Sequence, residues 1–162
     1  MYRILETFTV KPDVKGRIAL PSALRKALGE EVSGGFFIRR SMQENCLEMY
    51  TSQTWETELA KIQRLNPYVR EHRNFIRRFM AGVRFVEADA AGRINIPADL
   101  SVWACFDREV VLSPVGHMFE LWDKELYEQA LGRDEQSYAE LAEKIMAVSY
   151  THLRAHETCA DL

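Results

Sequence analysis

The chain has 162 residues, of which 47% are hydrophobic and 28% are charged, as is typical of a soluble globular protein. No apolar run approaches the ~20 residues that a membrane-spanning helix needs, and the first residues lack the apolar core of a signal peptide. The three cysteines are far apart and odd in number. We therefore expect a reduced, cytoplasmic chain with neither a disulfide framework nor a membrane partner.

Charge is unevenly distributed along the chain, although the net charge is only −3. Residues 1–28 carry six Lys or Arg against two acidic residues, and residues 61–84 carry seven against one. Residues 120–147 carry eight Asp or Glu against three basic residues. Because a polyanion responds to the local field, the net negative charge does not exclude a nucleic-acid partner for the two basic regions.

Two segments of the chain have almost the same sequence. The first, PDVKGRIALPSALR, runs from Pro12 to Arg25, and the second, ADAAGRINIPADLS, runs from Ala88 to Ser101. The residues that they share in register are Asp13/Asp89, Gly16/Gly92, Arg17/Arg93, Ile18/Ile94, Pro21/Pro97 and Leu24/Leu100. Apolar and β-branched runs bounded by Gly and Pro predict a strand, a turn, a second strand and a short helix at each copy.

The similarity continues beyond these segments. Residues 47–50, LEMY, match residues 119–122, FELW, and each stretch follows another predicted strand. The offset between the copies falls from 76 to 72 residues along the way, so the second copy lacks four residues that the first contains. We expect this loss in a hairpin loop.

Helices are predicted after each copy. Apolar residues at helical spacing predict helices over 55–65 and 69–79, separated by Asn66-Pro67, and Gly82 is suited to end the second. After the second copy, the helices that we expect are 124–131, between the cap Asp123 and the stop signal Gly132, and 135–147, capped by Asp134.

A unit of three or four short strands cannot easily bury both of its faces alone. Two copies in one chain can interlock, close a small barrel and remove free sheet edges. We therefore predict an α+β fold in which each copy supplies half of one shared core. The parts that we expect are a first half-unit 4–53, linking helices 54–82, a second half-unit 83–126, C-terminal helices 127–147 and a tail 148–162.

The repeated turn has a chemistry of its own. Gly16 can adopt a positive φ at little cost, so the chain can reverse after Lys15. The Asp13 carboxylate can then accept hydrogen bonds from turn amides, or it can hold the Arg17 guanidinium. An Asp-x-x-Gly-Arg segment alone is a common turn, so a purely structural role is the alternative interpretation.

The short helix after the first turn adds positive charge. Pro21 is suited to open this helix, and Arg25 and Lys26 on it can face the same side as Lys15. The first copy therefore has several basic side chains near its turn.

The complete repeated string, Asp-x-x-Gly-Arg-Ile-x-Ile/Leu-Pro-x-x-Leu, resembles the loop of the AbrB-like swapped-hairpin DNA-binding fold. Two copies in one chain, each followed by CLEMY- or FELW-type strands and a helix, resemble the MraZ family of bacterial transcription regulators over residues 4–147. The resemblance implies a double-split β-barrel of two half-units and ring-shaped homo-oligomers. It also implies a nucleoid-associated protein that binds double-stranded DNA at short direct repeats upstream of the division and cell-wall gene cluster.

The resemblance assigns DNA contact to the Asp-x-x-x-Arg loop and implies no cofactor, metal or catalytic residue. The DNA-binding candidates are Asp13, Lys15, Gly16 and Arg17 in the first loop, Asp89, Gly92 and Arg93 by pseudo-symmetry, and Arg25 on the short helix.

The two loops differ in charge. Ala91 occupies the position in the second copy that Lys15 has in the first, and Ser101 replaces an arginine that is usual in the family. Residues 84–101 carry two arginines against three acidic residues, a balance of −1. We therefore predict that the first loop faces DNA, with Arg17 on a guanine edge and Lys15 on phosphate. The second loop is then scaffold, a ring contact or a weaker DNA contact.

The basic helix predicted over 69–79 has two interpretations. Its arginines can add phosphate contacts, or they can form a solvated face and pair with the acidic residues 120–147. The arginines concerned are Arg70, Arg73, Arg77 and Arg78.

Other functions remain as alternatives. An AbrB-like antitoxin or transition-state regulator would keep the fold, but antitoxins usually carry one loop copy and a disordered tail. A metal-dependent enzyme is the remote alternative, because His152, His156 and Cys159 have the spacing of zinc ligands. We interpret that tail as vector-like sequence. Neither His72 nor His117 has a nucleophile or a paired carboxylate at a sequence spacing that would indicate a catalytic site.

Overall fold

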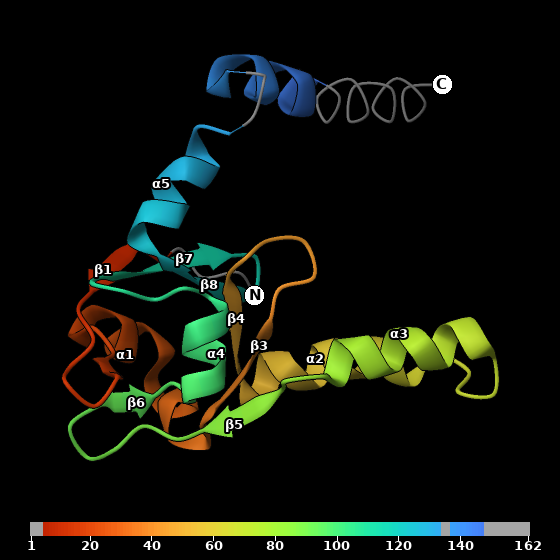
Figure 1. The fold of residues 1–162 in the computed structure, drawn as a ribbon, viewed down its shortest axis with the longest axis horizontal. Helices are drawn as coiled ribbons and strands as arrows, with labels where there is room; N and C mark the ends of the chain where they lie inside the picture. The colour runs from red at the N-terminus through yellow and green to blue at the C-terminus, as the bar shows by residue number, and fades with distance from the viewer. Residues whose placement is uncertain (1–4, 134–136, 148–162) are drawn as a thin grey trace, which may run out of the picture. The chain divides into compact units, whose positions relative to one another are not determined.

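The computed structural model describes residues 5–133 and 137–147 (Figure 1). The chain divides into two compact units, Met1–Tyr127 and Glu128–Leu162. The first unit contains both sequence copies and both candidate loops. Within the described ranges, no helix is long and apolar enough to cross a membrane.

Each sequence copy folds into a similar series of elements. In the first copy these are β1 (Phe8–Val10), β2 (Arg17–Ala19), α1 (Ser22–Leu28), the 3₁₀ helix η1 (Gly29–Gly34), β3 (Phe36–Arg40) and β4 (Leu47–Thr51). In the second copy they are β5 (Arg84–Val86), β6 (Arg93–Asn95), α4 (Ala98–Trp103), β7 (Val110–Val115) and β8 (Met118–Asp123). Three further helices are α2 (Ser52–Gln63) and α3 (Arg70–Met80) between the copies, and α5 (Lys124–Leu131) after them.

The strands interlock the two copies. A six-stranded antiparallel sheet has the order β1-β7-β8-β4-β3-β5, and β2 pairs with β6 in a second ladder. Strand β1 of the first copy pairs with β7 of the second, with Thr9 opposite Val111. Strand β5 of the second copy pairs with β3 of the first, with Phe85 opposite Phe37. Each copy therefore lends its first strand to the other, and the predicted α+β fold of two interlocked half-units is confirmed.

The repeated apolar residues form one shared core. Ile18 and Ile94 lie opposite each other in the β2–β6 ladder, and both are buried, as are Leu24 of α1 and Leu100 of α4. Burying one such side chain contributes ~1.5–3 kcal/mol. Because each pair takes one residue from each copy, neither copy completes the core alone.

The four residues missing from the second copy are not all lost in a hairpin loop. Phe36 pairs with Thr51 in the first copy, and Val110 pairs with Asp123 in the second, so the offset is 74 residues at the first strand of each hairpin and 72 at the second. Two residues are lost in the hairpin, as predicted. The other two are lost before it, where the first copy has η1. The prediction was partly wrong because β3 and β7 are too dissimilar in sequence to reveal the loss of two residues before the hairpin.

Helices α2 and α3 form an arm that projects from the sheet to the right in Figure 1. The Trp55 ring of α2 stacks on Phe37 of β3 at 5.2 Å and on Phe79 of α3 at 5.7 Å between ring centroids. These contacts fasten both helices to the sheet. Helix α3 ends just before Gly82, whose φ of 78° no L-residue adopts easily, and the predicted stop signal is confirmed.

Helix α5 begins directly after Asp123, whose carboxylate accepts a hydrogen bond from the Leu126 amide at 3.3 Å, and it ends before Gly132. The predicted cap and stop are confirmed. Residues 138–147 are helical as well, whereas the predicted cap Asp134 lies outside the described residues.

Candidate nucleic-acid interface

The first loop is held by the carboxylate of Asp13. Its Oδ1 atom accepts hydrogen bonds from the backbone amides of Lys15 and Arg17, both at 2.9 Å. Its Oδ2 atom accepts a hydrogen bond from Nε of Arg17 at 2.8 Å. Gly16, with a φ of 81°, allows the chain to reverse between these residues. The carboxylate therefore does both things that the sequence allowed, because it closes the turn and orients the guanidinium.

The second loop repeats this arrangement. Oδ1 of Asp89 accepts hydrogen bonds from the backbone amides of Ala91 and Arg93 at 2.9 Å, and Oδ2 accepts one from Nε of Arg93 at 3.0 Å. Gly92 has a φ of 77°. The two loops have the same internal geometry, so any difference in their function must come from the side chains around them.

Both loop aspartates are stabilised as anions. The hydrogen bond from the Arg17 amide lowers the pKa of Asp13, and the hydrogen bond from the Arg93 amide lowers the pKa of Asp89, each relative to an ordinary value of 3.8. Hydrogen bonds that favour the charged form are the physical cause in both loops. The carboxylates therefore stay ionised, and the loops stay closed, at any pH near neutrality.

The two loop arginines lie on one β-ribbon. In the β2–β6 ladder Arg17 lies opposite Asn95, and Arg93 lies opposite Ala19. Their side chains are similarly exposed, at 28% for Arg17 and 37% for Arg93. Because Nε is used inside the loop, Nη1 and Nη2 remain as the outer donors of a planar guanidinium. Figure 1 shows both loops at the left-hand end of the first unit.

Arg25 of α1 reaches the second loop, which the sequence did not predict. A Cβ atom added to Gly92 would lie 2.7 Å from Nη1 and 2.8 Å from Cζ of Arg25. Helix α1 is held near this loop because the Leu20 amide donates a hydrogen bond to the Gly92 carbonyl oxygen at 2.9 Å. A Cβ atom added to Gly16 would meet nothing within 4 Å. A residue of the first copy therefore supplies positive charge to the loop of the second.

Comparison with known proteins agrees with the repeat in the fold. The family model described as "MraZ protein, putative antitoxin-like" matches the chain twice, over residues 4–78 and 79–148. The chain belongs to the MraZ family. The two matches correspond to the two interlocked copies, so each sequence copy is one repeat of the MraZ family.

Three MraZ relatives are similar over most of their own length, and each is named Transcriptional regulator MraZ. The protein of Flavobacterium psychrophilum is 42% identical, over 90% of this chain and 93% of its own. The protein of Christiangramia forsetii is 41% identical, over 90% and 94%. The protein of Acetivibrio thermocellus is 36% identical, over 82% and 90%.

Four of the seven basic residues of the second basic region of this MraZ family chain lie on α3. Nε of Arg73 donates a hydrogen bond to the Pro67 carbonyl oxygen at 2.8 Å, and Nη1 of Arg77 donates one to Oδ1 of Asn74 at 3.1 Å. The arm and the loops are at opposite ends of the first unit in Figure 1. The arginines of α3 therefore share no surface with the loops of the same chain, and a phosphate contact by α3 would be separate from theirs.

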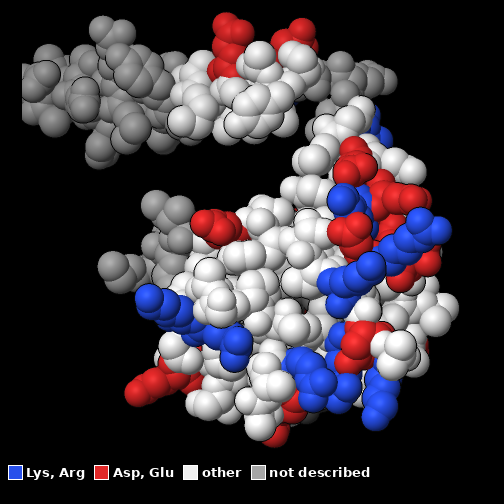
Figure 2. Space-filling model, turned by 90° about the vertical axis from the view of Figure 1, so that its left-hand side faces the viewer, with Lys and Arg blue, Asp and Glu red and all other residues white. Residues whose placement is uncertain are grey.

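Figure 2 views the molecule from the side on which the loops lie in Figure 1. Lys and Arg side chains gather there in several groups, with Asp and Glu side chains between them. The surface is not uniformly basic. The local field that a polyanion meets therefore depends on individual side chains at the loops.

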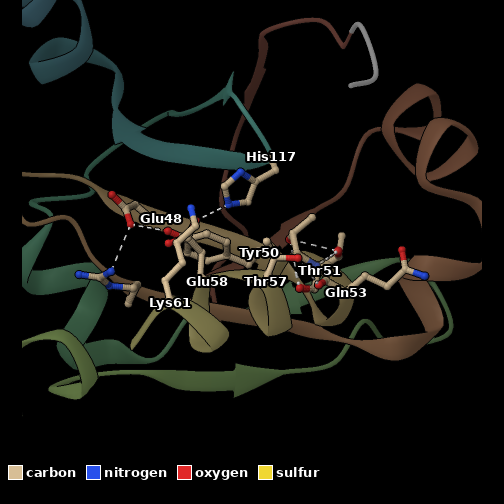
Figure 3. Close-up of polar contacts among 10 residues, drawn as sticks. Glu48, Tyr50, Thr51, Gln53, Thr57, Glu58, Lys61 and His117 are labelled. Carbon is tan, nitrogen blue, oxygen red and sulfur yellow. Dashed lines mark hydrogen bonds and ion pairs between the residues drawn. The ribbon is translucent and has the colours of Figure 1, made fainter. Parts of the chain in front are cut away.

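A second polar cluster lies between α2 and the β7–β8 turn (Figure 3). Nε2 of His117 contacts Oε1 of Glu58, which also accepts a hydrogen bond from Nζ of Lys61 at 3.1 Å. Nearby, Oε1 of Glu48 accepts a hydrogen bond from the Tyr50 hydroxyl at 2.8 Å. Sequence reasoning considered His117 only as a lone histidine. It missed the pair with Glu58 because the two residues are 59 positions apart, and no local pattern marks such a contact.

The groups near this cluster favour structure over nucleophilic chemistry. Burial raises the pKa of Tyr50 and of Cys46 above their ordinary values, so both side chains keep their protons near neutrality. In the part of the chain that the structure describes, no group of three His, Cys, Asp or Glu side chains could hold a metal ion. The tail residues with zinc-ligand spacing, His152, His156 and Cys159, lie outside the described residues.

Proposed function

We propose that this MraZ family protein is a sequence-specific DNA-binding regulator of transcription. The observation that carries the proposal is the pair of aspartate-held arginines, Arg17 and Arg93, on one β-ribbon. The names of the relatives support it, because each is called a transcriptional regulator. The partner is double-stranded DNA, and the function requires no cofactor, metal or catalytic residue.

Arg17 reads a base in this proposal. Asp13 holds the guanidinium through Nε, and a bidentate contact of the arginine with O6 and N7 of guanine discriminates against other bases by ~1–3 kcal/mol. Because the side chain is already ordered, binding costs less conformational entropy. Lys15 contacts a phosphate and sets the position of the loop on the duplex.

The DNA that we propose is a set of short direct repeats upstream of promoters of the division and cell-wall gene cluster. A ring-shaped homo-oligomer in the cytoplasm, associated with the nucleoid, binds these repeats. A ring brings several loops to several repeats at once, so contacts that are weak individually multiply into tight binding.

Selection of bound duplexes from a random DNA library, followed by sequencing, tests the proposal. The purified protein should enrich evenly spaced, short direct repeats. The matched control is the double variant Arg17→Ala/Arg93→Ala, which should enrich nothing, provided that its circular dichroism spectrum and its light scattering match the wild type. Absence of any enriched motif with the wild-type protein would refute sequence-specific binding.

A further inference from the structure

Helix α3 is attached to the rest of the first unit chiefly through one side chain. All residues of α3 lie in the described range, and only Phe79 among them is buried. Two other large apolar side chains of the helix, Phe75 and Met80, are 41% and 40% exposed. The packing of α3 on the sheet therefore depends mainly on Phe79.

Phe79 packs outside the core that the two copies share. It belongs to a small apolar cluster around Trp55, which is separate from the main core. Helix α2 is attached more firmly, because Trp55 also stacks on Phe37 of β3 and Glu58 contacts His117 of the β7–β8 turn. Displacement of Phe79 would therefore release α3 while α2 and the main core stay in place.

The side chain beneath Phe79 is a buried arginine. Arg39 of β3 is 2% exposed, and its Cζ atom lies 3.9 Å from the centroid of the Phe79 ring. Its Nε atom has no hydrogen-bond partner among the described residues. Its Nη1 atom is 3.7 Å from Oε1 of Glu48, which is too long for a hydrogen bond, and that oxygen already accepts one from the Tyr50 hydroxyl (Figure 3).

Closure of α3 over Arg39 combines two opposing contributions. Burial of the Phe79 ring and its attraction for the cation favour closure. Removal of water from a guanidinium that finds too few acceptors opposes closure. Glu48 adds to this opposition because it lies opposite the like charge of Glu120 in the β4–β8 ladder. Since water can reach the guanidinium when α3 is displaced, only the difference between these contributions holds the helix closed.

The chain allows α3 to move at both of its ends. After the helix, Gly82 has a φ of 78°. Before it, the Asn66 amide donates a hydrogen bond to Nδ1 of His72 at 3.0 Å, which ties the preceding turn to α3. Residues 65–66 and 81–82 are therefore the two points at which α3 and its turn can pivot as one piece.

We propose that α3 is a displaceable lid over the Arg39–Glu48 pair. In the closed position Phe79 covers the guanidinium. In the open position the guanidinium is hydrated, whereas α2, the sheet and both loops keep their structure. A partner that binds only one of the two positions would shift the population toward it. The lid is a property of the folded chain and does not depend on the proposed binding of DNA.

Hydrogen–deuterium exchange of the full-length protein, followed by mass spectrometry, tests whether α3 opens alone. Phe79→Ala should speed the exchange of the amides of residues 70–80 about a hundredfold, because so short a helix is marginal without packing. The amides of α2 and β3 should exchange at the wild-type rate. The matched control Met80→Ala, at an exposed apolar position of the same helix, should change none of these rates.

A rise of exchange in α2 or β3 together with α3 would show that α3 does not open separately, and it would overturn the proposal. If Phe79→Ala does not fold, Phe79→Leu keeps part of the buried area, and the same comparison of α3 with α2 decides.

The double variant Arg39→Met/Glu48→Gln tests whether the buried pair opposes closure. It removes both charges at once, so no unpaired charge is left buried, and an amide oxygen remains for the Tyr50 hydroxyl. The amides of α3 should exchange about tenfold more slowly than in the wild type. The matched control Arg64→Met/Glu56→Gln makes the same changes at exposed positions of the arm and should leave exchange in α3 unchanged.

Equal or faster exchange in α3 of the buried double variant would overturn the proposal, because the pair would then not oppose closure. Failure of this variant to fold would overturn it as well, since a pair that opposes closure is not required for folding. Light scattering must show the wild-type oligomer for each variant that is compared. Neither experiment measures DNA affinity, so a failure of the lid can be told from a failure of the proposed function.

Discussion

The first and second loops have the same backbone conformation and equivalent hydrogen bonds, yet different side chains surround them in the fold. Asp13 and Asp89 each bind two amides and one arginine Nε at nearly equal distances. The space beside Gly16 is open, whereas the Arg25 guanidinium lies against Gly92. A repeated sequence therefore gives a repeated geometry, and side chains from the other copy give the two loops different surroundings.

The largest effect is expected from separating the two copies. Residues 1–66 alone lack β7 and β5, which are the partners of β1 and β3 in the whole chain. This fragment should be unfolded, or it should pair with a second fragment as a swapped dimer. Circular dichroism, light scattering and NMR check the outcome. A stable monomer with dispersed amide signals would show that the two loops belong to independent domains. The two loops could then not be compared as parts of one folded unit.

Matched glycine substitutions should have the next largest effect. Gly16 and Gly92 have nearly the same positive φ, where an L-residue costs ~1 kcal/mol. Gly92→Ala must also displace the flexible end of the Arg25 side chain, so it should lower the free energy of unfolding slightly more than Gly16→Ala does. Denaturant unfolding of both variants measures this difference. A larger loss in Gly16→Ala than in Gly92→Ala would contradict the packing of Arg25 on the second loop.

Because the loop carboxylates have lowered pKa values, we expect pH to have only a small effect on their ionisation near neutrality. Hydrogen bonds lower the pKa of Asp13 and Asp89 from the ordinary value of 3.8. Since folding favours the ionised form of each carboxylate, its contribution to the free energy of unfolding is complete above its unfolded-state pKa. That contribution is lost as the pH falls through its lower folded-state pKa. The carboxyl chemical shifts of both residues should therefore stay constant from about pH 7 to about pH 5. A titration of either carboxyl within that range would contradict the hydrogen bonding of its loop.

The smallest effect is expected from the tail. The family model ends at residue 148, and residues 148–162 have no counterpart in the repeat. Deleting residues 148–162 should change neither the melting temperature of the protein nor its affinity for DNA. Thermal unfolding and anisotropy measure both quantities, and a loss of stability above ~1 kcal/mol would show that the tail packs on the folded chain.

Local interactions explain why the loops could be predicted from the sequence. Asp13 and Arg17 are four residues apart, and a glycine between them leaves few ways to close the turn. The interlocking of the copies was predictable for a similar reason, because short strands with apolar faces need partners from elsewhere in the chain. Both predictions required only the order of residues and general rules of hydrogen bonding and burial.

Contacts between the copies explain what the sequence did not show. The position of Arg25 depends on how α1 of the first copy packs beside the second loop, and no sequence spacing encodes that contact. The pair of His117 and Glu58 likewise joins a turn of the second copy to α2. The charge of the second loop was therefore underestimated, because counting along residues 84–101 leaves out a neighbour that only folding supplies.

The most direct test of the account compares Arg17→Ala with Arg93→Ala on one repeat-containing duplex, with the wild-type oligomer confirmed by light scattering for both. In the proposed ring, loss of a base contact of ~1–3 kcal/mol in every subunit would multiply across the proposed repeats. Arg17→Ala should therefore abolish measurable binding. Arg93→Ala should weaken binding and keep the preference for the repeats over unrelated DNA. Equal loss of binding and of preference in the two variants would contradict the different functions of the two loops.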